Sequence, residues 1–284
     1  MKNLYLDTRV LDERAGEKFG LSEELLMENA AAAIANFIRK KFKKGVRVLG
    51  VCGSGNNGAD VLAALRLLGG KFDCFAFLAS DKQNETSKTE LTRALKCGVN
   101  LISDLTESGE FDCIIDGIFG TGLSRELDER TINLINMLNE KSAYKLACDI
   151  PSGLDKNGVS QGAAFKADTT VTMGALKLAL YSDFAKDCVG RVKVANLGLS
   201  RQLYETQTSF YKLSKSDLNL PFRVKQNANK GDFGHVFIVS GEKVGAARIA
   251  GLAALTMGAG LVSVVGENLD LEPVLMQSAR IMPK

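Results

Sequence analysis

Residues 46–60 read VRVLGVCGSGNNGAD, and this stretch decides the fold that we expect. Its first half is apolar and rich in β-branched residues, which is typical of a parallel strand covered on both faces. Gly53, Gly55 and Gly58 then form a glycine-rich turn, and the apolar residues 61–68 predict a helix after it. Such a turn aims backbone N–H groups and a helix N-terminus at one point, so it favours a bound phosphate.

The turn has the spacing G-x-G-x-x-G, which taken alone is a weak indication of a nicotinamide dinucleotide site. A dehydrogenase would also need an acidic residue at the end of the second strand. Asp81 comes nearest to that place, but it lies further along the chain than the usual ~20 residues. No hydride-transfer groups accompany it. A purely structural glycine turn is a second interpretation.

Outward from this stretch, strand patterns alternate with helix patterns. Apolar runs predict strands at residues 72–78, 99–102, 112–116, 144–149, 169–173 and 191–195. Helices are predicted at 8–19, at 22–43 with Ser22 as N-cap, at 89–96 and at 126–140. This alternation indicates an α/β fold in three layers, with a mostly parallel sheet between helices. In such sheets ligands bind beyond the C-terminal ends of the strands.

The composition changes after the last of these strands. Residues 201–217 are polar and irregular, and we interpret them as a linker. A further strand–helix–strand pattern follows at 236–240, 246–257 and 261–265. One such unit is marginal as an independent domain. We therefore expect two domains, at residues 1–215 and 216–284.

The bulk composition is that of an ordinary globular protein, with 45% apolar and 24% charged residues. The net charge of +3 is too small to indicate binding to nucleic acid or to a membrane. No apolar run reaches the ~18 residues that cross a bilayer. The N-terminal residues lack the apolar core and cleavage site of a signal peptide. We expect a cytoplasmic protein.

Cysteine and histidine usage gives little sign of a metal centre. The six cysteines are scattered without a C-x-x-C pair, which favours buried, reduced thiols over a metal or disulfide role. The single histidine, His235, excludes a multi-histidine site. Lys40, Lys41, Lys43 and Lys44 lie at the end of a predicted helix, where they suit the helix dipole. We interpret them as a solvated helix end rather than a phosphate patch.

Small and polar residues follow the strands that end near residues 52, 115 and 148. If these strands are neighbours, their loops form one composite site. Asp116 and Asp149 lie at two of the ends, and each could also be an ordinary loop carboxylate. With Asn57 and Ser152 they supply the oxygen ligands that hard cations prefer. Asp149 is alternatively a general acid or base, if apolar neighbours raise its pKa. Residues 120–122, GTG, offer further N–H groups to a phosphate.

Several motifs together carry a specific resemblance. They are LLMENA at 25–30, GSGNNGAD at 53–60, DGIFGTGLSR at 116–125, DIPSGLD at 149–155 and ADTTVTMGALK at 167–177. In this order they resemble the YjeF N-terminal domain family, the NAD(P)H-hydrate epimerases, over roughly residues 1–215. The resemblance implies a Rossmann-like α/β fold, usually dimeric. It also implies an isomerase that interconverts the R and S epimers of hydrated NADH and NADPH at the nicotinamide C6 position.

The resemblance further implies roles for matched positions. The residues that would contact the hydrated dinucleotide are Asn56, Asn57, Gly58, Ala59, Asp60, Gly120, Thr121, Gly122, Leu123, Ser124, Arg125 and Asp149. Asn57, Asp116 and Ser152 would hold a potassium ion as cofactor. Asp149 would be the catalytic acid or base. C6 carries a hydroxyl next to the ring nitrogen, so loss of water or ring opening scrambles this centre without a redox cofactor.

The chain departs from the family at one point of the glycine turn. The family usually has NNGGDG, whereas residues 56–61 read NNGADV, so Ala59 and Val61 replace glycines. If either position requires positive φ or a close approach of substrate, we expect weaker binding.

Residues 229–265 resemble the opening of the ribokinase-like NAD(P)H-hydrate dehydratase, which is often fused behind the epimerase and uses ADP or ATP. The start of that domain is matched by Lys230, Gly231, Asp232, Gly234 and His235. A histidine without a functional role is an equally open interpretation of His235. The later glycine-rich nucleotide-binding motif and catalytic aspartate have no counterpart in this chain. We therefore expect an incomplete ribokinase-like segment without dehydratase activity, and a dehydratase partner in cis if the full-length chain is longer.

A non-catalytic nucleotide-binding or scaffolding module of the same fold is the alternative function. The near-neutral charge and the lack of low-complexity arms disfavour an RNA scaffold. The presence of both Asp116 and Asp149 favours chemistry. A conventional dehydrogenase is a third interpretation.

Overall fold

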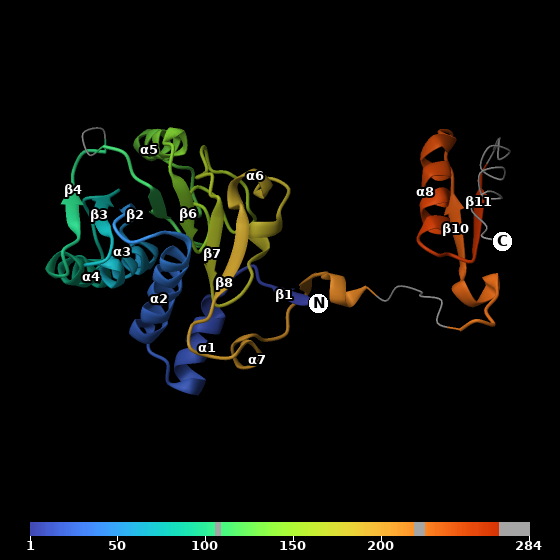
Figure 1. Cartoon of the computed structure of the whole chain (residues 1–284), viewed down its shortest axis with the longest axis horizontal. Helices are drawn as coiled ribbons and strands as arrows, with labels where there is room; N and C mark the ends of the chain where they lie inside the picture. The colour runs from blue at the N-terminus through green and yellow to red at the C-terminus, as the bar shows by residue number, and fades with distance from the viewer. Residues whose placement is uncertain (106–108, 219–224, 267–284) are drawn as a thin grey trace. The chain divides into compact units, whose positions relative to one another are not determined.

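The computed structural model describes residues 1–105, 109–218 and 225–266. The chain forms two compact units, Met1–Leu213 and Ser214–Lys284. Figure 1 labels the helices and strands of both units.

A seven-stranded sheet forms the centre of the first unit (Figure 1). Its order is β4-β3-β2-β5-β6-β7-β8, and every neighbouring pair is parallel. The order reverses between β2 and β5, which is the switch point of a Rossmann-like sheet. The predicted α/β fold with a mostly parallel sheet is confirmed. The strands are β2 (Arg47–Cys52), β3 (Asp73–Leu78), β4 (Asn100–Ile102), β5 (Cys113–Gly117), β6 (Tyr144–Cys148), β7 (Thr169–Met173) and β8 (Arg191–Ala195).

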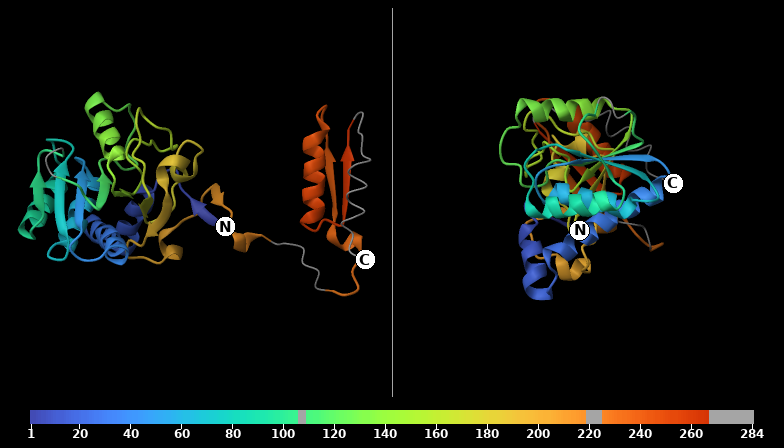
Figure 2. Two further views of the ribbon diagram at one scale, coloured as in Figure 1. Left: turned by 45° about the horizontal axis from the view of Figure 1, so that its top comes forward. Right: turned by 90° about the vertical axis from the view of Figure 1, so that its left-hand side faces the viewer.

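Helices cover both faces of this sheet (Figures 1 and 2). The helices α2 (Glu23–Lys41), α3 (Asn56–Leu68) and α4 (Glu85–Lys96) lie on one face, and α5 (Glu129–Glu140) lies on the other. Alternate residues of β2 explain this arrangement. Val48 and Cys52 pack into the first layer, whereas Leu49 and Val51 pack into the α5 layer. All four are fully buried, so the strand is apolar throughout. Helix α1 (Arg9–Phe19) adds Leu11 and Ala15 to the core of the first layer. The 3₁₀ helix η1 (Leu178–Tyr181) and α6 (Lys186–Val189) pack in a separate cluster.

Side-chain caps determine where three of the helices begin. Ser22 caps α2, which confirms the prediction. Asn84 caps α4, so this helix begins four residues before the predicted residue 89. Asp128 caps α5, which therefore begins at residue 129 rather than 126. The loop between β3 and α4 is therefore shorter than predicted, because the polar N-cap Asn84 was expected to lie within the loop.

The linker predicted at residues 201–217 is wrong for most of its length. The segment contains α7 (Arg201–Tyr204) and β9 (Phe210–Lys212), both within the first unit. β9 pairs antiparallel with β1 (Lys2–Leu4), which the sequence did not predict. Tyr204 is buried, and its hydroxyl donates to Asp12 Oδ1 on α1 at 2.6 Å. The segment looked like a linker because Tyr204 is its only buried residue between 201 and 213.

The second unit contains the predicted strand–helix–strand pattern. β10 (His235–Val239) and β11 (Leu261–Val265) are parallel, and α8 (Val244–Thr256) connects them. Two 3₁₀ helices, η2 (Lys215–Asp217) and η3 (Lys230–Phe233), precede β10. Phe237 is 65% exposed and Val239 is 85% exposed, so the described part of this unit buries little apolar surface. Residues 219–224 and 267–284 of the predicted second domain lie outside the described residues.

The cysteines and helices of the described ranges add two findings. Cys52, Cys74, Cys113 and Cys148 are buried free thiols, which confirms the prediction of burial. Among the helices of the described ranges, none combines the length and the apolar character that crossing a bilayer requires.

Candidate active site

The loops after β2, β5 and β6 meet at one edge of the sheet. These strands are adjacent and parallel, and Asp116 of β5 pairs with Val51 on one side and Ala147 on the other. The predicted adjacency of the three loops is therefore confirmed. The carboxyl ends of the strands at the switch point of such a sheet form the usual ligand crevice.

The glycine turn packs closely against the loop after β5. A Cβ on Gly53 would lie 1.9 Å from the carbonyl oxygen of Ile118, and a Cβ on Gly58 would lie 2.3 Å from that of Gly53. Both obstacles are backbone atoms, so neither position accepts a side chain. Gly55, the N-cap of α3, has open space beside it. A ligand therefore has room at the N-terminus of α3.

Ala59 and Val61, which replace the family's glycines, do not strain the backbone. Both lie inside α3 and are fully buried. A Cβ on Gly50 or Gly117 would lie 2.7 or 2.5 Å from the Val61 side chain. The glycines in β2 and β5 thus make room for Val61, which faces the sheet. Positive φ is required at neither position, because Asp149 is the only non-glycine residue of the described chain that has it.

The three residues predicted as cation ligands belong to one hydrogen-bonded cluster. The hydroxyl of Ser152 donates to Asp116 Oδ1 at 2.6 Å, and its backbone N–H donates to Oδ2 at 2.7 Å. The N–H of Phe119 donates to Ser152 Oγ at 2.8 Å. The amide Nδ2 of Asn57 donates to the carbonyl oxygen of Phe119 at 2.9 Å. Phe119 therefore connects Asn57 to the Asp116–Ser152 pair through its backbone.

Asp116 is a fully buried carboxyl group without a salt bridge in the described chain. Burial raises its pKa from 3.8 to about 6, although hydrogen bonds from Ser152 and from the N–H of Ile118 oppose the rise. An ionised Asp116 thus lacks a compensating charge, which a bound cation would supply. The oxygens around it are a carboxylate, a hydroxyl, a side-chain amide and a carbonyl, the donor types that hard cations prefer.

Asp149 is paired with a buried lysine. Lys177 Nζ lies 2.6 Å from Asp149 Oδ1, and the two side chains are 1% and 13% exposed. Lys177 also donates to Thr172 Oγ1 at 3.1 Å and to the carbonyl oxygen of Met173 at 3.0 Å. The N–H of Met173 donates to Asp149 Oδ1 at 3.1 Å. The carboxylate supplies the partner charge that a buried ammonium requires.

The backbone of Asp149 is in the left-handed region, with φ 69°. Its N–H donates to the carbonyl oxygen of Val171 at 2.8 Å, and the N–H of Ile150 donates to that of Cys148 at 2.9 Å. These bonds hold a conformation that costs about 1–3 kcal/mol. The predicted strand 144–149 therefore ends one residue early, at Cys148.

The N-terminal residues hold Lys177 in place. The N–H of Tyr5 donates to the carbonyl oxygen of Leu176 at 2.9 Å, and the N–H of Leu178 donates to that of Tyr5 at 2.8 Å. The hydroxyl of Tyr5 donates to the carbonyl oxygen of Thr206 at 2.6 Å. Sequence reasoning gave Lys177 no role. The available signal was a lysine inside the apolar run 175–180, ALKLAL, where an exposed charge is not expected.

A cavity of about 670 Å³ lies between α1, α2, the first turns of α3 and the end of β7. Asp12 and Asp60 line it, and both interact electrostatically with Asp149 and Lys177. Further polar residues in its wall are Arg9, Glu13, Glu17, Ser22, Glu23 and Asn56. The cavity therefore lies between the first turn of α3 and Met173, whose N–H donates to Asp149.

The carboxyl groups of this cavity have perturbed proton affinities. Burial raises the pKa of Asp60 well above its usual range, and the charges of Asp149 and Asp12 raise it further. Burial also raises the pKa of Asp12, against the hydrogen bond from Tyr204. The carboxyls of Asp12 and Asp60 thus lie within the electrostatic influence of the Asp149–Lys177 pair.

The remaining predicted contact residues lie in the loop at 120–125. Gly120 packs against Asn57, since a Cβ on it would be 3.5 Å from Asn57 Cγ. Gly122, Ser124 and Arg125 are exposed at this edge. Leu123 is buried, so only its backbone can face a ligand.

The family model described as YjeF-related protein N-terminus matches residues 23–179 of this chain, which include the glycine turn, Asp116 and the Asp149–Lys177 pair. The chain belongs to the YjeF N-terminal family. The predicted family resemblance is thus confirmed. The NAD(P)H-hydrate epimerase of Oenococcus oeni is 32% identical over 207 residues, covering 70% of this chain and 99% of that protein.

Longer members of the YjeF N-terminal family also match. The bifunctional NAD(P)H-hydrate repair enzyme Nnr of Helicobacter pylori is 41% identical over 268 residues, covering 93% of this chain and 57% of that protein. The chain thus spans about half the length of such bifunctional relatives. A crystal structure of the yeast protein ynu0 shares the fold, with TM-score 0.60 and 21% identity, over 75% of this chain and 98% of that one.

Proposed function

We propose that the first unit is an isomerase that interconverts the R and S forms of hydrated NADH and NADPH. The observation that carries this proposal is the buried Asp149–Lys177 pair, in which Asp149 accepts the N–H of Met173, a residue in the wall of a cavity that Asp60 and Asn56 also line. A relative of nearly the same extent as the first unit carries the name NAD(P)H-hydrate epimerase. The pair supplies acid–base chemistry, and the turn supplies room for a dinucleotide.

The reaction requires a proton at the C6 hydroxyl of the hydrated nicotinamide ring. When this oxygen is protonated, the C6–O bond breaks, water leaves, and the lone pair of the ring nitrogen stabilises the cation that remains. Water then adds to either face and returns the proton. We assign Asp149 as the acid or base, because Lys177 and the backbone of β7 fix its orientation. Asp60, with its raised pKa, can replenish the proton.

We assign the dinucleotide itself to the glycine turn and the loop after β5. Its diphosphate would lie at the N-terminus of α3, against residues 56–60, where Gly55 leaves open space. Loop 120–125, with half-buried Thr121 and exposed Arg125, would contact the same group from the other side. The predicted contact set from Asn56 to Arg125 stays a prediction.

We propose a potassium ion held by Asn57, Asp116 and Ser152. The support is the oxygen-only cluster around a buried carboxyl that has no salt bridge in the described chain. When bound, the ion supplies positive charge that offsets Asp116 and attracts an anionic substrate. The backbone of Phe119 joins Asn57 to Ser152 in this cluster.

We further propose that the protein acts as a homodimer in the cytoplasm. The second unit would be the opening of an ADP- or ATP-dependent dehydratase domain. This last point is supported by its βαβ pattern and by the bifunctional names of longer relatives. In the second unit, His235 Nε2 lies 2.9 Å from Ser263 Oγ across the two strands, so its ring has a structural partner.

The test is to incubate the chain with purified S- and R-hydrated NADH in potassium buffer and to follow their ratio by chromatography. We expect approach to equilibrium faster than in buffer alone. Asp149→Asn should abolish the acceleration, while Asp183→Asn, at an exposed position outside the site, should retain it. Circular dichroism establishes that each variant is folded. Folded wild-type protein that does not accelerate the interconversion contradicts the proposal, and tight binding without turnover would indicate the non-catalytic module.

A further inference from the structure

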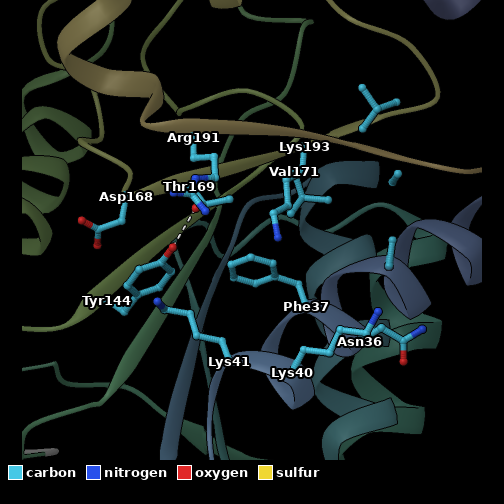
Figure 3. Close-up of a pocket in the computed structure, with 13 residues that line it drawn as sticks. Asn36, Phe37, Lys40, Lys41, Tyr144, Asp168, Thr169, Val171, Arg191 and Lys193 are labelled. Carbon is cyan, nitrogen blue, oxygen red and sulfur yellow. Dashed lines mark hydrogen bonds between the residues drawn. The ribbon is translucent and has the colours of Figure 1, made fainter.

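A second cavity lies near the N-terminal ends of the strands, whereas the candidate active site lies at their C-terminal ends. It encloses about 620 Å³ between α2 and the edge strand β8 (Figure 3). Tyr144, Thr169 and Arg191, which begin β6, β7 and β8, line it. The candidate active site lies where the strands end, so the two cavities are separate. We call this second cavity the basic pocket.

Positive charge dominates the lining of the basic pocket. Lys40 and Lys41 come from α2, and Arg191 and Lys193 come from β8. In the part of the chain that the structure describes, none of the four forms a salt bridge. Asp168 is the one acidic residue of the lining. Its Oδ2 accepts the N–H of Lys145 at 2.8 Å, and Figure 3 shows its carboxylate pointing away from the other side of the pocket.

Two of these lysines rest on aromatic rings instead of carboxylates. Lys41 Nζ lies 3.8 Å from the ring centroid of Tyr144, and Lys193 Nζ lies 4.6 Å from that of Phe37. Figure 3 shows both side chains reaching toward the rings. An ammonium gains less from a ring face than from a charge-assisted hydrogen bond to a phosphate oxygen. An anion entering the pocket can therefore recruit both lysines.

We propose that the basic pocket binds the diphosphate group of a nucleotide. Its volume is within the range of small-molecule sites, roughly 300–1,000 Å³. Arg191 offers a bidentate fork, and the lysines offer point charges on flexible stems. The hydroxyls of Tyr144 and Thr169 lie 2.7 Å apart, and because one donates to the other, the pair leaves one hydroxyl donor at the wall. The rings of Phe37 and Tyr144 provide an apolar surface beside the charges for the nucleoside.

These four cations are brought together by the fold, and their clustering could not be predicted from the sequence alone. Lys40 and Lys41 were interpreted as a solvated helix end, because their neighbours in the sequence gave no other indication. Arg191 and Lys193 are two residues apart on β8 and so project from the same face of the sheet. Packing of α2 beside β8 brings the two pairs of cations into one cavity.

The test is calorimetric titration of the full chain with ADP, inorganic pyrophosphate and adenosine at low ionic strength. We expect ADP to bind, pyrophosphate to bind more weakly and adenosine not to bind detectably. Arg191→Gln/Lys193→Gln should weaken ADP binding at least about tenfold, since it removes charge-assisted hydrogen bonds. Lys43→Gln/Lys44→Gln removes the same charge from exposed residues outside the pocket and should change the affinity by less than about twofold.

Each other outcome overturns the proposal. Equal ADP affinity in the wild type and Arg191→Gln/Lys193→Gln would show that the pocket is not used. Equal weakening by both double variants would show that affinity follows net charge alone. Adenosine binding as tight as ADP binding would contradict the diphosphate assignment. Loss of ADP binding in Asp149→Asn, with retention in Arg191→Gln/Lys193→Gln, would place the nucleotide in the candidate active site. Thermal unfolding verifies that each variant is folded.

Discussion

Lys177 Nζ lies 2.6 Å from Asp149 Oδ1, and the lysine side chain is only 1% exposed. Removing either partner leaves the other charge without its directly paired group, which in buried pairs costs about 3–5 kcal/mol. We expect Asp149→Asn to destabilise the first unit more than Lys177→Met, because the stranded ammonium is the more deeply buried group. The measurement is urea denaturation of each variant.

The double variant Asp149→Asn/Lys177→Met provides the control for this pair. With both charges removed, no ion remains buried without a partner, so the double variant should be more stable than Asp149→Asn alone. Strict additivity of the two single losses would show that the residues do not interact.

The left-handed backbone of Asp149 gives a second prediction. Asp149→Gly and Asp149→Ala lose the same carboxylate, but only glycine adopts φ 69° without a steric penalty. We expect Asp149→Gly to be more stable than Asp149→Ala by about 1 kcal/mol after allowance for the greater freedom of unfolded glycine. Matched denaturant titrations measure this difference. An alanine variant of equal or greater stability would show that the turn relaxes.

The buried carboxyl of Asp116 predicts a pH dependence of stability. Burial raises its pKa from 3.8 to about 6, so the folded state binds a proton more tightly than the unfolded state does. Its contribution is fully present below about pH 4 and is lost as pH rises through 6. The loss is on the order of 3 kcal/mol, since one pKa unit corresponds to about 1.4 kcal/mol. Denaturation between pH 4 and 7 without potassium should show this fall, and Asp116→Asn should lack it.

Potassium should reverse part of that loss. If the ion binds beside ionised Asp116, potassium chloride will raise the melting temperature at pH 7.5 and will raise it less at pH 5, where this carboxyl holds its proton. Tetramethylammonium chloride at equal ionic strength serves as the control. Equal effects of the two salts at both pH values would refute the assigned ion site.

The segment after β8 predicts the smallest stable form of the first unit. A chain ending at Leu213 keeps α7, β9 and the hydrogen bond between Tyr204 and Asp12. A chain ending at Ser200 lacks all three. We expect the first to unfold cooperatively in a thermal melt and the second to melt at a clearly lower temperature. Similar melting temperatures would show that the segment is a linker after all.

Local sequence patterns predicted most of the strands, but not the pairing of β1 with β9. The strands at 169–173, 191–195 and 261–265 have the predicted bounds, because polar or glycine residues flank their β-branched runs. β1 was not predicted because three residues are too few to show an alternation of polar and apolar side chains. Its partner β9 also lies at the far end of the unit. The start of α4 was misplaced because the cap Asn84 has the same polar character as a loop residue.

The candidate site follows the same division. The strand-end rule placed Asn57, Asp116 and Ser152 near one another, and the structure joins them through Phe119. Lys177 was missed because its partner lies on another strand end, and no short-range pattern marks a buried ion pair. The dinucleotide contacts stay predictions, since they depend on a ligand as well as on the chain.

The hydroxyl of Tyr5 accepts the N–H of Thr206 at 3.0 Å, while the backbone of Tyr5 holds the segment that carries Lys177. The first and the last parts of the unit therefore meet beside the ion pair. During synthesis on a ribosome, the strands and loops of the sheet are complete well before Thr206 emerges. The hydrogen bonds between Tyr5 and Thr206 can form only after that moment, so the support behind the Asp149–Lys177 pair is completed late in the synthesis of this unit.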